Sequence, residues 1–214
     1  VRARYAGRLI IHSHDWMAGG AVTAYAKLRS CPVLHTIHNV HTGHVPLEML
    51  SGIALKPLSE YLYYSEDYGR PCIDSQATAI KNASLVSFVG EQFLKEIVED
   101  RFPDRDIVAE SIRQEVKAKY YNGNTLTIQN APSPMIYPER CDGLACNYGP
   151  DDDVIRAKQE NLVAFQRKTG LIVNPEAILL YWPSRLDPMQ KGVHLLEDIA
   201  HKFVMAHSDA QIAI

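Results

Sequence analysis

Long apolar runs are missing from this chain, and so is a strong excess of either charge. No apolar stretch approaches the ~18 residues that a membrane-spanning helix needs. Lysine and arginine total 22 against 25 aspartate and glutamate residues, which gives a formal net charge of −3. Such a small charge gives no electrostatic reason to expect a nucleic acid or an anionic membrane as a partner. We therefore expect a globular protein that binds neither.

Cysteine is also scarce, with four residues in a chain of 214. Secreted domains that depend on disulfides are shorter and richer in cysteine. Cys141 and Cys146 are too far apart for a CxxC redox or zinc motif, and no second such pair exists. We expect reduced, free thiols and a cytoplasmic protein.

Short apolar runs alternate with amphipathic stretches along the whole chain. The runs are rich in Val, Ile and Leu rather than strictly alternating, as in strands that are covered on both faces. Candidate strands are 7–12, 32–38, 84–90, 125–130, 177–185 and 210–214, and candidate helices are 18–29, 91–102, 152–169 and 192–207. This alternation predicts a doubly wound α/β fold with mainly parallel sheets.

Turn-forming residues concentrate between Asn130 and Pro150, where four prolines and two glycines occur. Such a composition predicts a domain boundary or a long connection in this region. Strand candidates lie close to both ends of the chain, although buried parallel strands need neighbours on both sides. We therefore expect the chain to be an excerpt of a longer protein.

Six of the nine histidines lie between residues 12 and 44. His12 and His14 are expected just after the first strand, and His38 ends the second. Ligands of open α/β sheets bind outside the carboxyl ends of the strands. The helix predicted to open at residues 17–20 would direct its N-terminal amides toward the same crevice. Phosphates and sugar hydroxyls suit such a place.

Three alternatives remain open for these residues. A His-x-His pair at a strand end is a common metal-binding arrangement. The binuclear hydrolase motif HxHxDH, however, needs its aspartate one residue after Asp15 and a histidine at Met17, so the match fails twice. Local packing or hydrogen bonding suits His35, His41 and His44, and capping of the following helix is an alternative role for Asp15.

Five motifs, in order, resemble those of bacterial glycogen synthases and plant starch synthases, which form glycosyltransferase family 5. HSHDWMAGG followed by PVLHTIHNVHTG is similar to the family's HAHDWH and FT(V/I)HN…G. Residues 83–97 are similar to its AD-x-(V/I)-T-x-V-S…Y-x-x-E-I motif. TIQNA, residues 127–131, and SRLDPMQKG, residues 184–192, are similar to its G-(I/V)-x-N-G-(I/V)-D and SRL…QKG motifs.

The sequence departs from the family at three places. Ala131 stands where the family usually has glycine, with Asp two residues on. One more residue than in many members separates Arg185 from Lys191, and Met17 replaces a common histidine. The family's KxGGL loop, its later glycine-rich loop and its EPxGL motif are not among these 214 residues.

The resemblance implies a GT-B fold with two Rossmann-like doubly wound domains, both incomplete in this chain. Residues 1–130 would be the later part of the N-terminal, acceptor-side starch synthase catalytic domain. Residues 131–214 would be a linker and the start of the C-terminal, nucleotide-sugar-binding domain.

The resemblance also implies a reaction: retaining transfer of glucose from ADP-glucose to the non-reducing end of an α-1,4-glucan. Charge grows on the departing diphosphate, and fixed cations aimed at that charge lower the barrier. Arg185 and Lys191 are expected to act there, with an exposed basic loop as the alternative. By family correspondence, His38 would lie nearest the sugar and Asp15 near the reacting centre, both as catalytic residues. No metal or cofactor is then needed.

His14, Asn39 and Asn130 are expected to bind substrate or to hold the cleft. Rival hypotheses are a related GT-B enzyme with another nucleotide sugar, a metal-dependent hydrolase built on HSHD, and a non-catalytic glycan-binding relative. The 214 residues alone are expected to be inactive.

Overall fold

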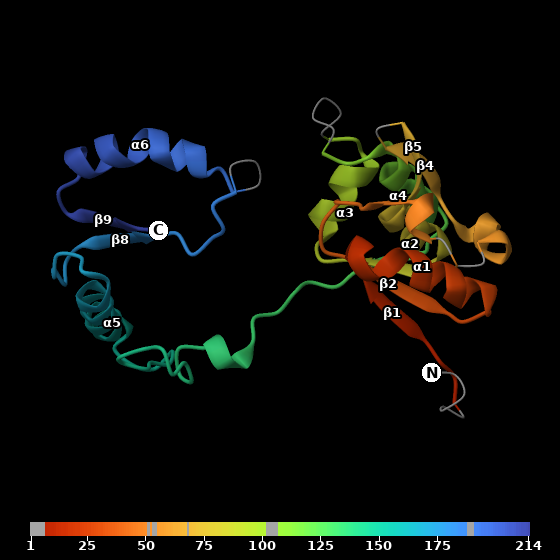
Figure 1. Ribbon diagram of the computed structural model, residues 1–214. Coiled ribbons are helices and arrows are strands. Elements are labelled where there is room, and N and C mark those ends of the chain that lie inside the picture. Colours follow the sequence, from red (N-terminus) through yellow and green to blue (C-terminus); the bar gives the residue numbers. More distant parts are fainter. Residues whose placement is uncertain (1–6, 51, 53–54, 68, 102–106, 188–190) are drawn as a thin grey trace. The chain divides into compact units, whose positions relative to one another are not determined.

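The protein divides into two compact units, Val1–Ala131 and Pro132–Ile214 (Figure 1). The computed structural model describes residues 7–50, 52, 55–67, 69–101, 107–187 and 191–214. Within this described part, no helix is both long and apolar enough to cross a membrane.

A four-stranded parallel sheet forms the centre of the first unit. Its strands are β1 (Ile11–His14), β2 (Val33–Ile37), β6 (Leu85–Phe88) and β7 (Thr125–Thr127), in the order β1-β2-β6-β7. The predicted strands 32–38 and 84–90 are confirmed, and β7 is shorter than its predicted range. The first strand lies later than predicted. His12 and His14 are therefore part of β1 rather than of the turn after it.

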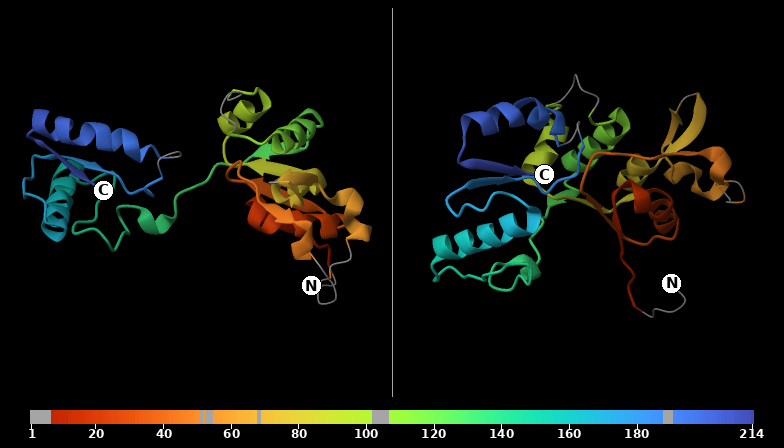
Figure 2. Two further views of the ribbon diagram at one scale, coloured as in Figure 1. Left: turned by 45° about the horizontal axis from the view of Figure 1, so that its top comes forward. Right: turned by 60° about the vertical axis from the view of Figure 1, so that its left-hand side comes forward.

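Four helices accompany this sheet: α1 (Asp15–Leu28), α2 (Ser75–Asn82), α3 (Glu91–Val98) and α4 (Glu110–Tyr121). α1 packs along α2, and α3 packs on α4; Figure 2 gives two further views of them. α1 begins three residues before its predicted range, and α3 ends before residue 102, which lies outside the described residues. α2 and α4 were not predicted.

Side chains that alternate in direction along the central strands explain where the main core lies. Val33 and Ile37 of β2 and Val86 and Phe88 of β6 are almost completely buried, and they pack in one cluster with residues of α3 and α4 such as Ile112. Each such side chain contributes about 1.5–3 kcal/mol when it leaves water.

A small antiparallel sheet, absent from the prediction, lies beside the parallel one. It consists of β3 (His44–Pro46), β4 (Tyr64–Asp67) and β5 (Arg70–Asp74), in the order β3-β5-β4. Two 3-10 helices, Leu47–Leu50 and Lys56–Tyr61, precede β4. β5 runs directly into α2, so this sheet fixes where α2 begins.

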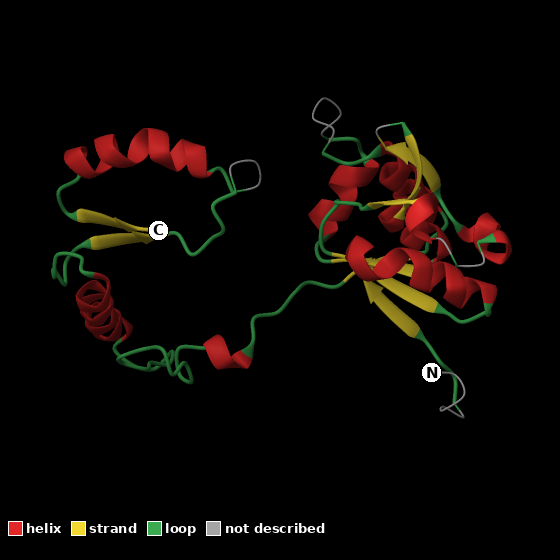
Figure 3. Cartoon of the chain, in the orientation of Figure 1, coloured by secondary structure: helices red, strands yellow, loops and turns green. Residues whose placement is uncertain are grey.

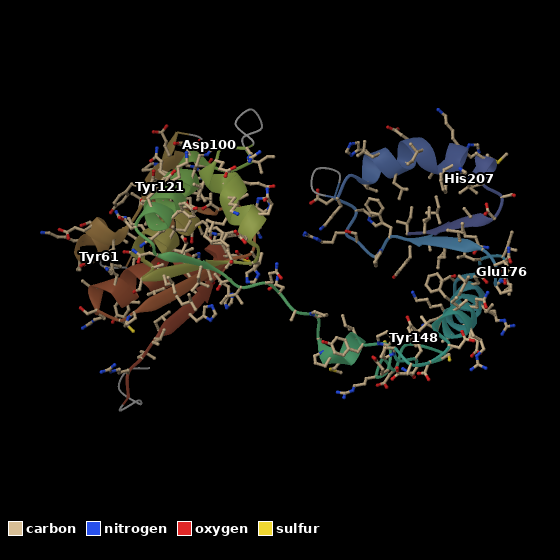
Figure 4. The ribbon with its side chains drawn as sticks, turned by 180° about the vertical axis from the view of Figure 1, so that it is seen from behind. Tyr61, Asp100, Tyr121, Tyr148, Glu176 and His207 are labelled. Atoms are coloured by element: carbon tan, nitrogen blue, oxygen red, sulfur yellow. The ribbon has the colours of Figure 1, made fainter. Side chains whose placement is uncertain are left out.

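An ion-paired aspartate joins the end of α3 to α4. Asp100, labelled in Figure 4, lies 2.6 Å from the Lys117 ammonium and 3.0 Å from the Arg113 guanidinium. The hydrogen bond from Lys117 is the main reason that the pKa of Asp100 is lowered, and the charges of Lys117 and Arg113 act in the same direction. This pairing links the residue after the C-cap of α3 to α4.

The second unit contains two parallel strands, β8 (Ile178–Tyr181) and β9 (Ala210–Ala213), with α5 (Val154–Thr169) and α6 (Val193–Ala206). α6 packs against β9 (Figure 3). All four elements confirm the predicted ones, and β8 is shorter than its predicted range. The Asp153 side chain caps α5 by accepting a hydrogen bond from the Arg156 amide, as the run of aspartates indicates.

Candidate functional site

Polar side chains cross three neighbouring strands on one face of the first sheet. His12 Nε2 lies 2.8 Å from Thr36 Oγ1, which in turn lies 2.6 Å from Ser87 Oγ. The strand register places His14 beside Thr36 and Thr36 beside Ser87, so these side chains share a face. Sequence reasoning missed Thr36 and Ser87, although the alternation within β2 and β6 could have revealed them.

His14 and His38 join the ends of β1 and β2. His14 Nδ1 lies 3.0 Å from His38 Nε2, and the two rings stack with centroids 5.3 Å apart. One of these nitrogens donates and the other accepts, so at least one of the two rings is neutral. Reduced hydration lowers the pKa of His12, and the neighbouring imidazoles of His14 and His38 lower it further.

Asp15 connects the same two strand ends from the buried side. Only 8% of its surface is exposed, and its Oδ1 accepts a 2.8 Å hydrogen bond from the His38 amide. The N-cap of α1 is His14, without a side-chain cap, so the capping alternative for Asp15 is wrong. Asp15 also has a φ of +47°, a left-handed conformation that is uncommon outside glycine. Such a conformation, held in place by the surrounding contacts, is often found at functional sites.

His35 lies on the opposite face of β2 and is fully buried. Its Nδ1 is 2.9 Å from Ser13 Oγ, which confirms that this histidine packs and bonds locally. Burial lowers its pKa to about 4, against a smaller opposing effect of the Asp15 charge. Its Nε2 and the side-chain amide of Gln76 are buried without a hydrogen-bond partner among the described residues.

The loop after His38 folds into a short turn. Asn39 Oδ1 accepts a 2.9 Å hydrogen bond from the His41 amide. This bond uses the Asn39 oxygen to shape the loop. Asn130 is exposed in the segment that follows β7.

The glycine pair of α1 serves packing, which corrects the expectation that residues 17–20 open the helix toward a ligand. A Cβ on Gly19 would lie 2.6 Å from Ala79 Cβ, and one on Gly20 would lie 2.6 Å from Ser75 Oγ. The Gly20 amide donates to Ser75 Oγ. These glycines let α1 approach α2 closely, and the helix itself begins at Asp15.

The histidines do not assemble a metal site among the residues that the structure describes. No group of three or more His, Cys, Asp or Glu side chains there has an arrangement that could hold an ion. The contacts of His12 with Thr36 and of His14 with His38 occupy nitrogens that a metal would need.

The second unit carries the two expected cations on one loop. Arg185 and Lys191 are exposed, and they flank the turn between β8 and α6. The Lys191 and Gly192 amides both donate to the Asp187 carbonyl, at 2.9 and 3.1 Å, and Gly192 has a φ of +69° at the N-cap of α6. Residues 188–190 of the motif lie outside the described residues. Two cations beside a helix N-terminus suit a phosphate group.

A pocket of about 720 Å³ lies beyond the carboxyl ends of β8 and β9. Arg185, Trp182 and Tyr181 are among the residues that line it. Trp182 Nε1 is buried and has no hydrogen-bond partner in the described part of the chain. An indole N–H at such a pocket can donate to a ligand.

The structure thus brings Asp15, His14, His38 and Asn39 together in the first unit, and it places Arg185 and Lys191 on the connection between β8 and α6 in the second. The two sets belong to different units of the chain.

Comparison with known proteins shows similarity to one family of proteins over about half of the chain. Residues 3–106 match the family described as "Starch synthase catalytic domain". The chain is 26% identical over 205 residues to glycogen synthase 1 of Synechocystis sp. (strain ATCC 27184 / PCC 6803 / Kazusa), covering 96% of this chain and 39% of that protein. It is 29% identical over 194 residues to the glycogen synthase of Rhodopseudomonas palustris (strain HaA2), covering 89% and 38%.

A solved structure shares the fold. The catalytic domain of starch synthase IV from Arabidopsis thaliana, bound to ADP and acarbose, superposes with a TM-score of 0.70 at 20% identity, over 95% of this chain and 41% of that one. This likeness confirms the α/β fold of GT-B type, in partial form. The chain spans about two fifths of the length of the relatives that it matches.

Proposed function

Since residues 3–106 match the starch synthase catalytic domain and the chain is similar to glycogen synthases, we propose that the protein is a retaining glucosyltransferase. It transfers glucose from ADP-glucose to the non-reducing end of an α-1,4-glucan. The observation that carries the proposal is the pairing of this similarity with a preformed group of polar side chains at the ends of β1 and β2.

In this proposal the first unit binds the glucose. His38 lies at the end of β2, with its amide held by Asp15 and its ring by His14. A ring nitrogen of His38 that is not bonded to His14 then meets a sugar hydroxyl. Asp15 Oδ2 accepts no hydrogen bond from the residues that the structure describes, which leaves it for the reacting centre or the acceptor. Asn39 shapes the loop beside them, and Asn130 adds a further amide.

The second unit supplies the groups that stabilise the leaving diphosphate. The bond between glucose and the diphosphate breaks with growing negative charge on the phosphate oxygens. Arg185 offers a planar fork of donors and Lys191 a compact charge, so both interact more strongly with the transition state than with the ground state. The proton released by the acceptor hydroxyl leaves with the nucleotide product or solvent, and no metal is required.

The test uses the full-length protein with ADP-glucose and glycogen, and it measures ADP release. Arg185→Ala and Lys191→Ala should each lower kcat by about 10²–10³-fold, the usual effect of removing one such stabilising group. Arg167→Ala on α5 and Lys202→Ala on α6 are matched controls, because both side chains are exposed. Full activity in the Arg185 and Lys191 variants would refute these roles.

Nucleotide specificity is tested by replacing ADP-glucose with UDP- and GDP-sugars. If the protein turns over only a UDP-sugar or only a GDP-sugar, that sugar is the donor instead of ADP-glucose, and the proposed type of reaction still holds. Glucan binding without turnover of any donor would instead favour the non-catalytic relative.

Two further parts of the proposal concern the chain itself. We propose a cytoplasmic location, which the four free cysteines support because a reducing compartment keeps thiols free. We also propose that residues 1–214 alone release no ADP, because they span only about two fifths of the related synthases.

A further inference from the structure

The first turn of α2, residues Asp74–Gln76, contacts the loop that follows His38, although the two are far apart in the sequence. Asp74 is fully buried at the junction of β5 and α2. We call residues 74–76 the α2 turn. Its three members make side-chain or backbone hydrogen bonds to Thr42 and Gly43 of that loop.

Asp74 accepts hydrogen bonds from three elements. Its Oδ1 accepts from Thr42 Oγ1 at 2.5 Å and from the Ala77 amide at 2.9 Å, and its Oδ2 accepts from Ser111 Oγ at 2.6 Å. Ser111 belongs to α4, so a single carboxylate joins the loop, α2 and α4. No lysine or arginine in the described part of the chain forms an ion pair with it. Hydroxyl and amide donors therefore stabilise this buried group.

The direction of the Thr42 hydrogen bonds is fixed. Thr42 Oγ1 accepts from the Gln76 amide at 3.1 Å, and a backbone amide can only donate. The single hydroxyl proton of Thr42 is thus available for Asp74. An Asn at position 74 would satisfy Thr42 and Ser111 together less well, because only one of its two side-chain polar atoms accepts.

Ser75 fixes the other side of the loop. Its amide donates to the Gly43 carbonyl at 3.0 Å, and its hydroxyl donates to the Trp16 carbonyl at 2.6 Å. Gly43 is required here, since a Cβ would overlap the Trp16 ring. The α2 turn therefore holds both the loop and the first turn of α1, which contains Asp15.

We infer that Asp74 and Thr42 are positioning residues for the reaction, an inference that rests on the proposed function. The loop has one attachment at His38, through Asp15, and a second at Thr42, through Asp74. Only residues 39–41 lie between these attachments. Two buried carboxylates thus fix both ends of the segment that follows the sugar-binding histidine.

The consequence is a defined position for His38 and Asn39 before any ligand binds. Catalytic groups that are displaced by about 1 Å can lose about 10²-fold in rate. Loss of the Thr42 attachment frees one end of the loop without removing any group that touches the substrate. The rate should therefore fall while the fold is retained.

The main experiment compares two substitutions of one residue in the full-length protein. Thr42→Val keeps the branched shape and removes the hydroxyl, whereas Thr42→Ser keeps the hydroxyl. We expect Thr42→Val to lower kcat/KM about 10- to 100-fold per folded molecule. Thr42→Ser should restore most of this loss. Equal kcat/KM values in Thr42→Val and the wild type would overturn the inference.

A second pair of variants tests the α4 attachment. Ser111→Ala removes the hydrogen bond to Asp74. Ser59→Ala is the matched control, because among the described residues the Ser59 hydroxyl bonds only to the Lys56 carbonyl of its own turn. Ser111→Ala should lower kcat/KM by less than Thr42→Val, and Ser59→Ala should leave it unchanged. An effect of Ser59→Ala as large as that of Ser111→Ala would contradict the assignment.

A readout that does not depend on turnover separates this inference from the proposed function. In the 214-residue chain, the imidazole C2–H resonances of His38 and His41 should shift in Thr42→Val, while those of His194 and His207 in the second unit stay fixed. Unchanged His38 and His41 resonances would overturn the positioning role. If the wild-type protein releases no ADP from ADP-glucose, the proposed reaction fails, and the resonances still decide whether Thr42 positions the loop.

Discussion

His35 should make the stability of the first unit depend on pH. The imidazole is fully buried, and burial lowers its pKa to about 4 in the folded chain, against 6.5 for an ordinary histidine. The folded protein therefore keeps His35 neutral at pH values at which the unfolded chain already binds a proton. The perturbation that tests this is His35→Gln, which keeps a polar side chain near Ser13 and removes the titrating group.

The magnitude follows from the difference between the two pKa values. Each fall of one pH unit between about 6.5 and about 4 lowers the free energy of unfolding by about 1.4 kcal/mol, because the unfolded state carries the extra proton. The contribution of His35 is fully present above pH 6.5 and is lost as the pH falls through this window. The loss is about 2 kcal/mol at pH 5 and about 3 kcal/mol below pH 4. The free energy of unfolding of a whole domain is only about 5–15 kcal/mol.

The assay is urea unfolding at pH values from 7.5 to 5, followed by tryptophan fluorescence. The chain has two tryptophans, one in each unit, so Trp182→Phe leaves Trp16 as the reporter of the first unit. We expect the difference in unfolding free energy between this background and its His35→Gln derivative to shrink by about 2 kcal/mol from pH 7 to pH 5. His41→Gln, which removes an exposed imidazole, is the matched control.

Taking the difference between two proteins removes the contributions of the other titrating groups. Glu115, whose pKa burial raises, would otherwise add a pH dependence of the opposite sign. A difference that stays constant from pH 7 to pH 5 would refute the reasoning. So would a His35 ring that titrates near pH 6.5 by NMR in the wild-type chain, a measurement that remains possible if His35→Gln does not fold.

Two further substitutions test local packing and capping. Gly43→Ala should lower stability by about 1–3 kcal/mol, because its Cβ would overlap the Trp16 ring, whereas Gly143→Ala, with only an ordinary contact, should be nearly neutral in thermal unfolding. Asp153→Ala should cost about 1 kcal/mol in the second unit by removing the hydrogen bond to the Arg156 amide, while Asp151→Ala serves as its control. If Gly43→Ala or Asp153→Ala unfolds at the same temperature as the wild type, the contact that the variant alters does not contribute to stability.

Sequence periodicity predicted the parallel strands and the long amphipathic helices well, because their apolar residues recur at regular spacing. It missed α2, whose sequence SQATAIKN has no apolar stripe. This helix is nevertheless almost wholly buried, since α1 approaches it through Gly19 and Gly20. Tertiary packing, rather than amphipathicity, keeps α2 helical, and no local pattern reports such packing.

The candidate site was predicted in composition and only partly in geometry. The polar residues at the ends of β1 and β2 were expected to gather, and they do. Ending the first strand at residue 12 and placing His14 after it was wrong, because a polar HSH sequence is not typical of a buried parallel strand. The hydrogen bonds of Ser13, Thr36 and Asp74 were not predicted, because a sequence motif does not show which side chains it brings into contact.

Strand alternation gives histidines that are close in sequence different chemical roles. His35 faces α1, where burial keeps it neutral, while His12 and His14 face outward and contact one another. The outward rings hydrogen-bond to Thr36 and His38 before any ligand arrives. In the proposed reaction, binding a sugar would need little ordering of these side chains, because groups fixed in advance stabilise a developing charge more effectively than mobile ones. His12, His14 and His38 therefore form a preformed polar surface, whereas the neighbouring His35 serves the buried side of the sheet.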